Sequence, residues 1–502
     1  MSGIRLSLLI SLSESYLLAA IALASSMLVA RILTPEEIGI YSVSVAVLAV
    51  AQVLRDFGIG SFIVQAQQLT DDIIRTAFGL SLVVGTTLFA LVFLAAPHAA
   101  TFYDEPRLYG TLVISAINFL ILPFCSISMS ILKREMQFKR IALINVTAAI
   151  CTGLVVVGAG MLDAGPKSMA IGAVANSIIT AVGTWLARAD HRFLAPGFSE
   201  WRSLVRFGGQ AAAASTITSI ALSANDLIVG KVLGFGPVAL ISRAQGLMNL
   251  FHRDLMNAIR NVAFPAFARA KRDGEAAQLE ARYTYSVTSL SAFAWPFYGL
   301  LAVFPLEILR LLFGAQWDAA APMIPIFAAA GAISATMNLT QPLMIAIGRI
   351  DLVTRAEFIV QPARIAAIAF AAIWFKSAFA CAVAYLLIIA CAVPVFYRAK
   401  EHALPTDFSM LLRGLLISAA VTAIALLPAL AAVALMRTGT ATALPLLPFL
   451  ATIGLCAVAW LCAIHLLSHP ISRDSGYVRI QSTIFGRVAS RLKTSAVEEN
   501  HQ

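Results

Sequence analysis

The sequence has 502 residues, of which 60% are apolar and only 12% are charged, and its mean hydropathy is +0.85. Soluble globular proteins average roughly 45–50% apolar and about 25% charged residues, so this chain has too little charge to cover a surface that faces water. The composition excludes a soluble enzyme, and it excludes a disordered chain, which needs low hydropathy and high charge. A polytopic membrane protein remains. Since a spanning helix uses about 20 apolar residues, this length predicts on the order of 12–14 helices.

Long apolar runs locate these helices, and the runs are too long for the alternating strands of a membrane barrel. In chain order, the predicted helices cover about residues 8–30, 38–66, 77–97, 109–132, 141–161, 168–187, 208–230, 238–268, 283–305, 320–347, 354–375, 378–397, 411–435 and 442–467. Helix breakers separate them, for example Thr34-Pro35-Glu36-Glu37 and Tyr103-Asp104-Glu105-Pro106. The pattern predicts an all-α membrane protein of about fourteen helices.

The connections between these helices fall into two alternating sets, one for each side of the membrane. One set, together with both termini, holds 24 Lys and Arg residues, and the other set holds 7. Because Lys and Arg gather in cytoplasmic loops, this division supports the helix assignment and predicts that both termini are cytoplasmic. The net charge of +10 is then a consequence of membrane orientation, and we expect no nucleic-acid partner.

An internal repeat indicates two lobes. Residues 28–42 (LVARILTPEEIGIYS) agree in type at seven positions with residues 228–242 (IVGKVLGFGPVALIS), and Arg55-Asp56-Phe57 has a near-counterpart, shifted by two, in Arg253-Asp254-Leu255. Six helices intervene, so the halves enter the membrane in the same direction, as in parallel-repeat transporters; duplication of an apolar pattern alone is the alternative. The predicted parts are a lobe at residues 1–200, a second six-helix lobe at 201–405, an extra helix pair at 406–468 and a basic tail at 469–502.

Nine charged side chains inside the predicted spans are singled out as candidates. They are Arg55, Arg243, Arg253, Arg260 and Arg364, with the acids Glu14, Asp56, Asp226 and Asp254. A charge near the bilayer centre costs at least ~2.5–3.5 kcal/mol, so such residues usually serve a function.

Several of these charges form a stripe on the predicted helix 238–268. At 100° per residue, the polar residues fall within an arc of about 140°; they are Arg243, Asn249, Arg253, Asp254, Asn257, Arg260 and Asn261. Because the guanidinium fork suits phosphate oxygens, the stripe predicts a cavity for an anionic ligand such as a pyrophosphate. The candidate ligand-binding residues are Arg55, Arg243, Asn249, Arg253, Asn257, Arg260 and Arg364. The alternative is that Arg253 and Asp254 pair with Asp56 and Arg55 to lock the two lobes.

The intramembrane acids are candidates for ion coupling or for pairing between the lobes. Glu14 lies deep in the first helix among serines and is the better coupling candidate. Asp226 lies about one turn from the outer end of its helix, and the sequence leaves open whether it is a proton or cation site or an interfacial residue. Asp56 and Asp254 are the pairing candidates.

No catalytic or metal-binding motif occurs, and the six cysteines lack zinc or CxxC spacing. The longest connection between helices is about twenty residues, too short for a catalytic domain, so we expect a transporter without a cofactor or a metal. After His469, the apolar residues Ile484, Phe485, Val488 and Leu492 share a helical face, which is typical of an amphipathic surface helix; a disordered basic tail is the alternative.

Several segments together resemble a known family. They are Arg31-Ile-Leu-Thr-Pro-Glu-Glu-Ile-Gly39, Lys133-Arg134-Glu135-Met136-Gln137-Phe138-Lys139-Arg140, Asn225-Asp226-Leu-Ile-Val-Gly-Lys231, Ser242-Arg243-Ala-Gln-Gly-Leu-Met248, Phe264-Pro265-Ala266-Phe267-Ala-Arg269 and Phe313-Gly314-Ala315-Gln316-Trp317. Spread in order over about residues 25–320, they resemble the polysaccharide transporter family, the Wzx-type flippases of lipid-linked oligosaccharides. Arg243 and Asp226 lie within these segments, whereas the other candidate residues carry no family assignment.

The resemblance implies a MATE-like fold of two pseudo-symmetric lobes, in the multidrug/oligosaccharidyl-lipid/polysaccharide exporter superfamily. It implies a bacterial inner membrane and an undecaprenyl-pyrophosphate-linked oligosaccharide that crosses by alternating access for exopolysaccharide, capsule or O-antigen synthesis. A polysaccharide polymerase, a chain-length regulator and membrane lipids are the implied partners. Two rivals stay open, a drug/cation antiporter of the same superfamily and a membrane-embedded glycosyltransferase or polymerase. Five arginines against four acids inside the spans favour an anionic head group.

Overall fold

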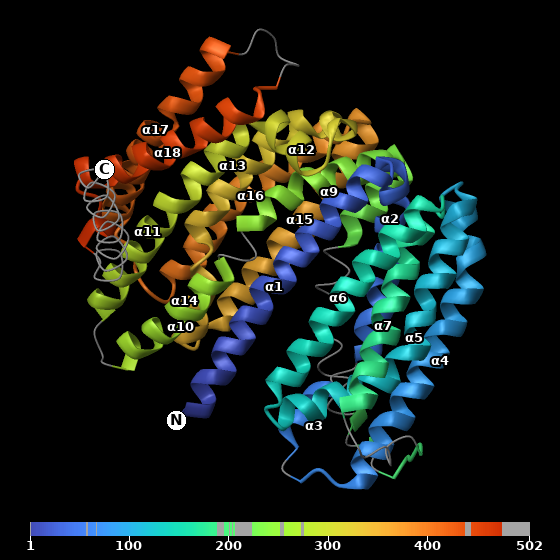
Figure 1. Ribbon diagram of the computed structural model, residues 1–502. Coiled ribbons are helices and arrows are strands. Elements are labelled where there is room, and N and C mark those ends of the chain that lie inside the picture. Colours follow the sequence, from blue (N-terminus) through green and yellow to red (C-terminus); the bar gives the residue numbers. More distant parts are fainter. Residues whose placement is uncertain are drawn as a thin grey trace, which may run out of the picture. The chain divides into compact units, whose positions relative to one another are not determined.

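The computed structural model describes residues 2–56, 59–66, 68–187, 195–199, 201–202, 204–205, 223–251, 256–272, 276–436 and 443–473, and the regular structure in these ranges is helical (Figure 1). Eleven helices of this described part are long and apolar enough to cross a membrane. The predicted amphipathic helix at Ile484–Leu492 lies outside these ranges. The contacts divide the chain into two units.

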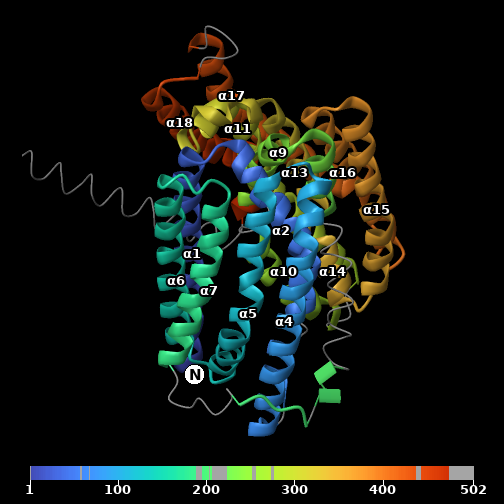
Figure 2. The ribbon, with the colours of Figure 1, turned by 90° about the vertical axis from the view of Figure 1, so that its right-hand side faces the viewer.

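Unit 1 comprises residues 1–242, 310–319 and 365–381. Its helices are α1 (Ser2–Ile32), α2 (Pro35–Asp56), α3 (Ile59–Gln65), α4 (Asp71–Phe102), α5 (Pro106–Arg134), α6 (Phe138–Met161) and α7 (Lys167–Ala187), and residues 223–233 are also helical. Helices α4, α5, α6 and α7 lie side by side (Figures 1 and 2). Gly85 allows α4 and α5 to come close together. A Cβ atom at this position would overlap the carbonyl oxygen of Phe119.

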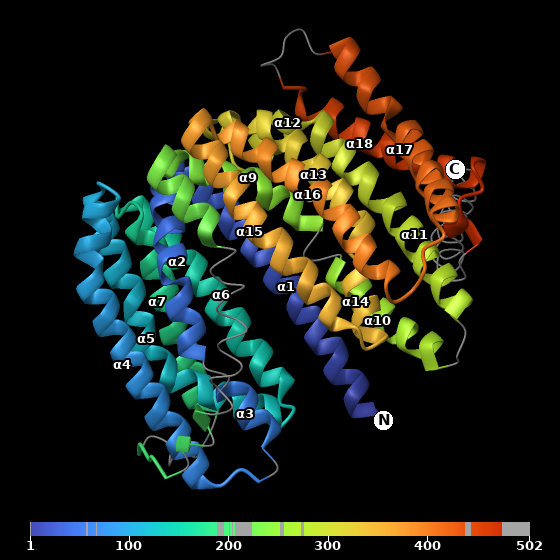
Figure 3. The same ribbon diagram turned by 180° about the vertical axis from the view of Figure 1, so that it is seen from behind.

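Unit 2 comprises residues 243–309, 320–364 and 382–502. Its elements are α10 (Met256–Arg272), α11 (Ala276–Val303), α13 (Ile324–Met337), α14 (Thr340–Ala346), α17 (Phe408–Met436), α18 (Leu446–Leu466) and the short η4 (Pro470–Arg473). Five elements are divided between the units: α9 (Phe235–Asn249), α12 (Pro305–Leu312), η3 (Ala315–Met323), α15 (Ile350–Phe375) and α16 (Ala378–Glu401). Helix α11 packs against α13 and α17, and α17 packs against α18 (Figure 3).

The breakers named in the sequence begin and end helices as predicted. Thr34 and Glu37 form a capping box at the start of α2: the Thr34 N–H donates to Glu37 Oε2 at 2.8 Å, and the Glu37 N–H donates to Thr34 Oγ1 at 3.3 Å. Glu105 caps α5 in the same way, accepting a 3.0 Å hydrogen bond from the Arg107 N–H. Reciprocal bonds of this kind satisfy amides that the first helical turn leaves without partners.

Three predicted segments each contain more than one helical element of the structure. The segment 38–66 contains α2 and α3, and 320–347 contains η3, α13 and α14. The break between α13 and α14 falls at Asn338 and Leu339 because Pro342 has no N–H to donate to the carbonyl of Asn338, four residues earlier. The segment 238–268 is divided between α9 and α10, with a π-helical turn at Leu250 and Phe251.

Proline does not interrupt α11, which continues through Pro296. This proline cannot bond the carbonyl of Ala292. The indole Nε1 of Trp460 on α18 donates to that carbonyl at 2.8 Å. Helix α11 is therefore continuous through Pro296, and the carbonyl that this proline leaves without a donor is bonded from a neighbouring helix.

Candidate functional site

The structure describes the side chains of five of the seven predicted ligand-binding residues. Arg55 lies on α2 in unit 1, Arg243 and Asn249 lie on α9, Arg260 on α10 and Arg364 on α15, and the last four belong to unit 2; all five are half-buried. Arg253 and Asp254 lie outside the described residues, as do the side chains of Asp56, Asn257 and Asn261. The pairing of Arg253 with Asp56 therefore stays a prediction.

The polar stripe was expected on one continuous helix, and this expectation is wrong for residues 250–251. Helix α9 ends at Asn249 and a π-helical turn follows at Leu250 and Phe251. A π turn bonds residues five apart, so it changes the rotation of every later residue about the helix axis. Residues 252–255 lie outside the described part of the chain, so the arc that relates Arg243 to Arg260 stays a prediction.

Polar side chains from three helices of unit 2 meet around Tyr385. Gln245 on α9 makes a side-chain hydrogen bond to the Tyr385 hydroxyl on α16, and Arg364 on α15 lies within electrostatic range of this tyrosine. One turn before Arg364, Gln361 Nε2 donates to Glu357 Oε2 at 2.7 Å. Polar groups at membrane depth must face protein or water rather than lipid. Tyr385, Gln245 and Arg364 therefore form an interior polar cluster of unit 2.

Arg260 lies at the break between α13 and α14. Its Nη1 donates to Asn338 Oδ1 at 3.3 Å. The same break is bound by two tyrosines: the Tyr397 hydroxyl donates to the carbonyl of Thr336 at 2.8 Å, and the Tyr283 hydroxyl lies 2.9 Å from Thr340 Oγ1. Arg260 is thus held at a point where the helical backbone bonding is interrupted.

A buried ion pair beside this break was missed by the sequence analysis. Lys400 Nζ lies 2.5 Å from Glu280 Oε2, and the Lys400 side chain is fully buried. The ammonium also donates to Thr406 Oγ1 at 2.9 Å and lies 4.6 Å from the centre of the Tyr283 ring. From the sequence alone, Lys400 is one of the 24 basic residues assigned to the cytoplasmic side. Helical spacing could not reveal the pair, because its residues are 120 positions apart.

Glu14, the candidate for ion coupling, lies on α1 in unit 1. Its Oε1 accepts a 2.7 Å hydrogen bond from Asn145 Nδ2 on α6. Asn118 on α5 accepts a 2.6 Å bond from the Ser177 hydroxyl on α7. Asp226 is half-buried in the helical residues 223–233 of the same unit. Among the described residues, no group of three His, Cys, Asp or Glu side chains is placed to hold a metal ion.

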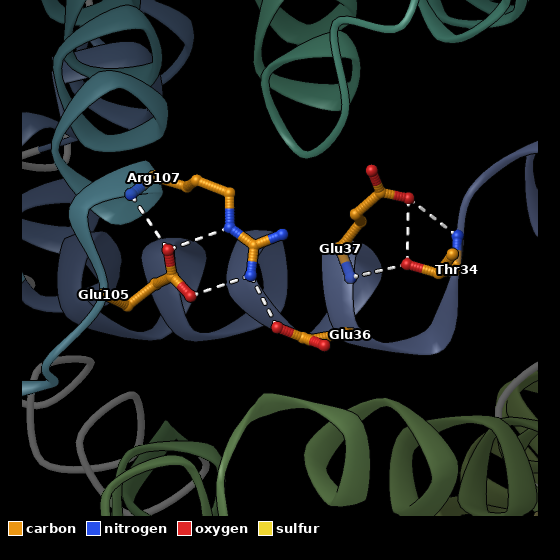
Figure 4. A network of polar contacts seen from close by, with 5 residues as sticks. All are labelled: Thr34, Glu36, Glu37, Glu105 and Arg107. Atoms are coloured by element: carbon orange, nitrogen blue, oxygen red, sulfur yellow. Dashed lines mark hydrogen bonds and ion pairs between the residues drawn. The ribbon is translucent and has the colours of Figure 1, made fainter.

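A charged network surrounds the start of α2 and of α5, at the end of unit 1 that we call the Thr34 end (Figure 4). Arg107 bridges two acids: its Nη2 lies 2.5 Å from Glu36 Oε1 and 2.9 Å from Glu105 Oε2. The Arg107 side-chain hydrogen bonds hold the pKa of Glu105 below its ordinary value. Both carboxylates thus already have a cationic partner within the network.

Basic residues of the family-like segments cap the C-termini of helices. Arg134 Nη1 donates to the carbonyls of Ile63 and Ala66, at 2.8 and 2.6 Å, where α3 ends. Arg140 Nη1 donates to the carbonyl of Ala187 at the end of α7, at 2.8 Å. Cations are favourable at helix C-termini, whose last carbonyls lack helical partners. These two arginines therefore have a structural role.

Comparison with known proteins adds a family assignment. Residues 28–322 match the family model described as "Polysaccharide biosynthesis protein". The lipopolysaccharide biosynthesis protein WzxC of Escherichia coli K12 is 24% identical over 343 residues, 67% of this chain and 68% of that protein. The succinoglycan biosynthesis transport protein ExoT of Rhizobium meliloti is 23% identical over 325 residues, 64% of this chain and 65% of that protein.

Solved structures show the same fold. The lipid II flippase MurJ, in an inward closed conformation, has a TM-score of 0.70 at 13% identity, covering 93% of this chain and 100% of that one. An inward-facing multidrug resistance MATE transporter has a TM-score of 0.59 at 12% identity, covering 77% of this chain and 94% of that one. These similarities confirm the predicted all-helical, MATE-like membrane fold.

Proposed function

The chain belongs to the family of polysaccharide biosynthesis proteins, and on this premise we propose that it is a flippase for a lipid-linked oligosaccharide. Family membership makes it a transporter and not an enzyme, as the sequence predicts. The proposed substrate carries an undecaprenyl pyrophosphate, and its glycan passes from the cytoplasmic to the periplasmic leaflet by alternating access. The product would supply exopolysaccharide, capsule or O-antigen synthesis, with a polymerase and a chain-length regulator as partners.

The observation that carries this proposal is the set of arginines in the polar interior of unit 2. Arg364 lies in the cluster with Tyr385 and Gln245, and Arg260 lies at the α13–α14 break. A permanent positive charge inside a membrane lobe favours an anionic ligand, and the guanidinium fork can bond two phosphate oxygens at once. We assign head-group binding to these two and to Arg55, Arg243, Asn249, Arg253 and Asn257, with Glu14 as the coupling candidate and Asp56, Asp226 and Asp254 as further coupling or pairing residues.

The proposed topology has fourteen spans in an inner membrane, with both termini in the cytoplasm. Eleven helices of the described residues are long and apolar enough to be spans. The other three predicted spans correspond to the pair α2/α3, the pair α9/α10 and the helix that contains residues 223–233. Each of them is next to residues that the structure does not describe. The 24:7 division of basic residues supports this orientation.

The rival function is export of cationic drugs. The likeness to MATE transporters supports the fold alone, whereas the five arginines named inside the spans favour an anionic substrate. Deletion of the gene should abolish surface polysaccharide and leave lipid-linked glycan on the cytoplasmic side, measured by enzymatic labelling of inverted membrane vesicles. Sensitivity to cationic dyes without a glycan defect would establish the rival instead.

A plasmid copy should restore export to the deletion strain. Arg364→Ala should fail to restore it, and Arg364→Lys should restore part of it, because lysine keeps the charge without the fork. Arg398 on α16 is exposed and serves as a matched control: Arg398→Ala should export normally. Equal export by Arg364→Ala and wild type, at equal membrane levels, contradicts a head-group role for Arg364.

A further inference from the structure

Unit 1 joins segments from both halves of the sequence. Besides the first two hundred residues, it contains residues 223–242 and 310–319, which include parts of α9, α12 and η3. Residues 223–242 and 310–319 make contacts at the Thr34 end. They contact the ends of helices that lie within the first two hundred residues.

The C-terminus of α1 receives two donors from η3. Since the Thr34 N–H bonds the Glu37 side chain, it does not close the α-helical bond to the carbonyl of Ala30. That carbonyl instead accepts from Trp317 Nε1 at 2.8 Å and from Gln316 Nε2. The Trp317 side chain is fully buried, so this contact excludes water.

The C-terminus of α4 is capped from the second half in the same way. Lys231 Nζ donates to the carbonyl of Phe102, the last residue of α4, and lies 3.2 Å from Asp104 Oδ2. A cation at this position interacts favourably with the helix dipole. In return, Arg31 of α1 donates to the carbonyl of Leu311 near the end of α12, at 2.9 Å.

Two glycines allow the segments to touch. A Cβ atom at Gly39 on α2 would overlap the carbonyl oxygen of Phe235 at the start of α9. A Cβ atom at Gly230 would lie 2.7 Å from Val43 Cγ2, and Val43 is fully buried. The two halves therefore meet at the Thr34 end through a packed, water-excluding contact as well as through hydrogen bonds.

We propose that these contacts form a latch that closes the Thr34 end, defined by Lys231, Gln316 and Trp317 on the carbonyls of α4 and α1. The orientation proposed from the basic residues makes this the periplasmic end. The latch rests on the proposed alternating-access transport, because substrate release to the periplasm requires this end to open. Its acceptors are helix-terminal carbonyls near the membrane surface, which water can satisfy after opening, so the latch is reversible.

A disulfide across the latch tests this proposal. Val43→Cys with Gly230→Cys places sulfur atoms across the packed contact, in a background whose six native cysteines are replaced by alanine and whose export equals wild type. Oxidation should stop export, and reduction should restore it. The matched control is Ser25→Cys with Gly153→Cys, which joins α1 to α6 within the first half, where the Gly153 Cβ position is 2.5 Å from Ser25 Oγ. The control disulfide should leave export unchanged.

Accessibility of the contact provides a second measurement. Val43→Cys alone should react slowly with a membrane-impermeant maleimide applied from the periplasm. Adding Lys231→Ala or Gln316→Ala should raise the labelling rate several-fold, whereas Lys167→Ala, a lysine change at the first turn of α7, should not.

Export that persists in fully cross-linked Val43→Cys/Gly230→Cys protein overturns the latch, and so does a labelling rate that the latch changes leave unaltered. A deletion strain with a normal glycan phenotype overturns the proposed function instead, while the labelling rates still decide whether the Thr34 end is latched. Failure of the 43–230 disulfide to form, when the 25–153 disulfide forms, also overturns the latch.

Discussion

The indole of Trp460 on α18 donates its Nε1 hydrogen to the carbonyl of Ala292 on α11, at 2.8 Å. This is the one carbonyl that Pro296 leaves without an α-helical donor. The extra helix pair thus satisfies a backbone group of α11 at membrane depth, where water cannot do so.

Trp460→Phe should lower the stability of the protein by about 1–3 kcal/mol, because it leaves a buried carbonyl without a donor. The double change Trp460→Phe with Pro296→Ala should recover most of this loss, since an alanine at position 296 supplies the missing N–H. The measurement is the thermal unfolding midpoint of detergent-solubilised protein. If both variants are equally unstable, the loss comes from ring packing against Phe293, 5.0 Å away between ring centres, and not from the carbonyl.

His469 should make the docking of α17 and α18 sensitive to acid. The imidazole is fully buried, its Nδ1 accepts the Ile471 N–H at 3.2 Å, and its Nε2 lies 3.0 Å from the Ser418 hydroxyl, which donates to the carbonyl of Thr288. An acceptor at Nδ1 requires the neutral ring, and burial lowers the pKa of His469 below its ordinary value of 6.5.

The unfolded chain therefore takes up this proton at a higher pH than the folded chain. Stability is complete above the ordinary histidine pKa and falls as the pH decreases below it, towards the folded pKa. Unfolding midpoints measured from pH 7.5 to about pH 5 should decrease more for wild type than for His469→Gln. His402→Gln changes an exposed histidine and should keep the wild-type profile. A His469→Gln profile as steep as wild type contradicts the assignment.

Breaking the Lys400–Glu280 pair should be strongly destabilising. Lys400→Met leaves the Glu280 carboxylate buried without its cation, which costs about 3–5 kcal/mol. The double change Lys400→Met with Glu280→Gln should be much closer to wild type, because no uncompensated charge remains. Membrane yield and the unfolding midpoint measure this, with exposed Arg398→Met as the control on the same helix. A double variant as unstable as the single one would show that packing of the Lys400 stem dominates.

Arg253 and Asp56 separate head-group binding from locking of the lobes. If Arg253 binds pyrophosphate, Arg253→Ala abolishes export at normal protein levels, Arg253→Lys restores part of it, and Arg253→Ala with Asp56→Ala stays inactive. If the two residues only pair, the double change regains export because no buried charge is stranded. Surface polysaccharide, normalised to inserted protein, measures all three variants. Full recovery in the double variant removes Arg253 from the binding site.

The membrane class, the fold and most helix boundaries were predictable from the sequence because they depend on local signals. Thr34 and Glu37 are a capping pair three residues apart, and such spacing can be read directly. The contacts of the site were not predictable, because they join distant positions. Lys400 carries the same local signal as an exposed loop lysine, and only the tertiary fold places it beside Glu280. The π-helical turn at Leu250 likewise has no signal in the apolar pattern, which predicts a regular α-helix there.

The break at Asn338 divides one transmembrane segment between two neighbours. Helix α13 packs against α11, whereas α14 packs against α10, which carries Arg260. Pro342 removes a backbone bond that would continue the helix, so the two pieces have separate packing partners. A movement of α10 and α14 about this pivot would reorient the Arg260 guanidinium while α13 stayed fixed on α11. The positive charge of Arg260 would then point in a different direction within unit 2, and no helix would have to unfold.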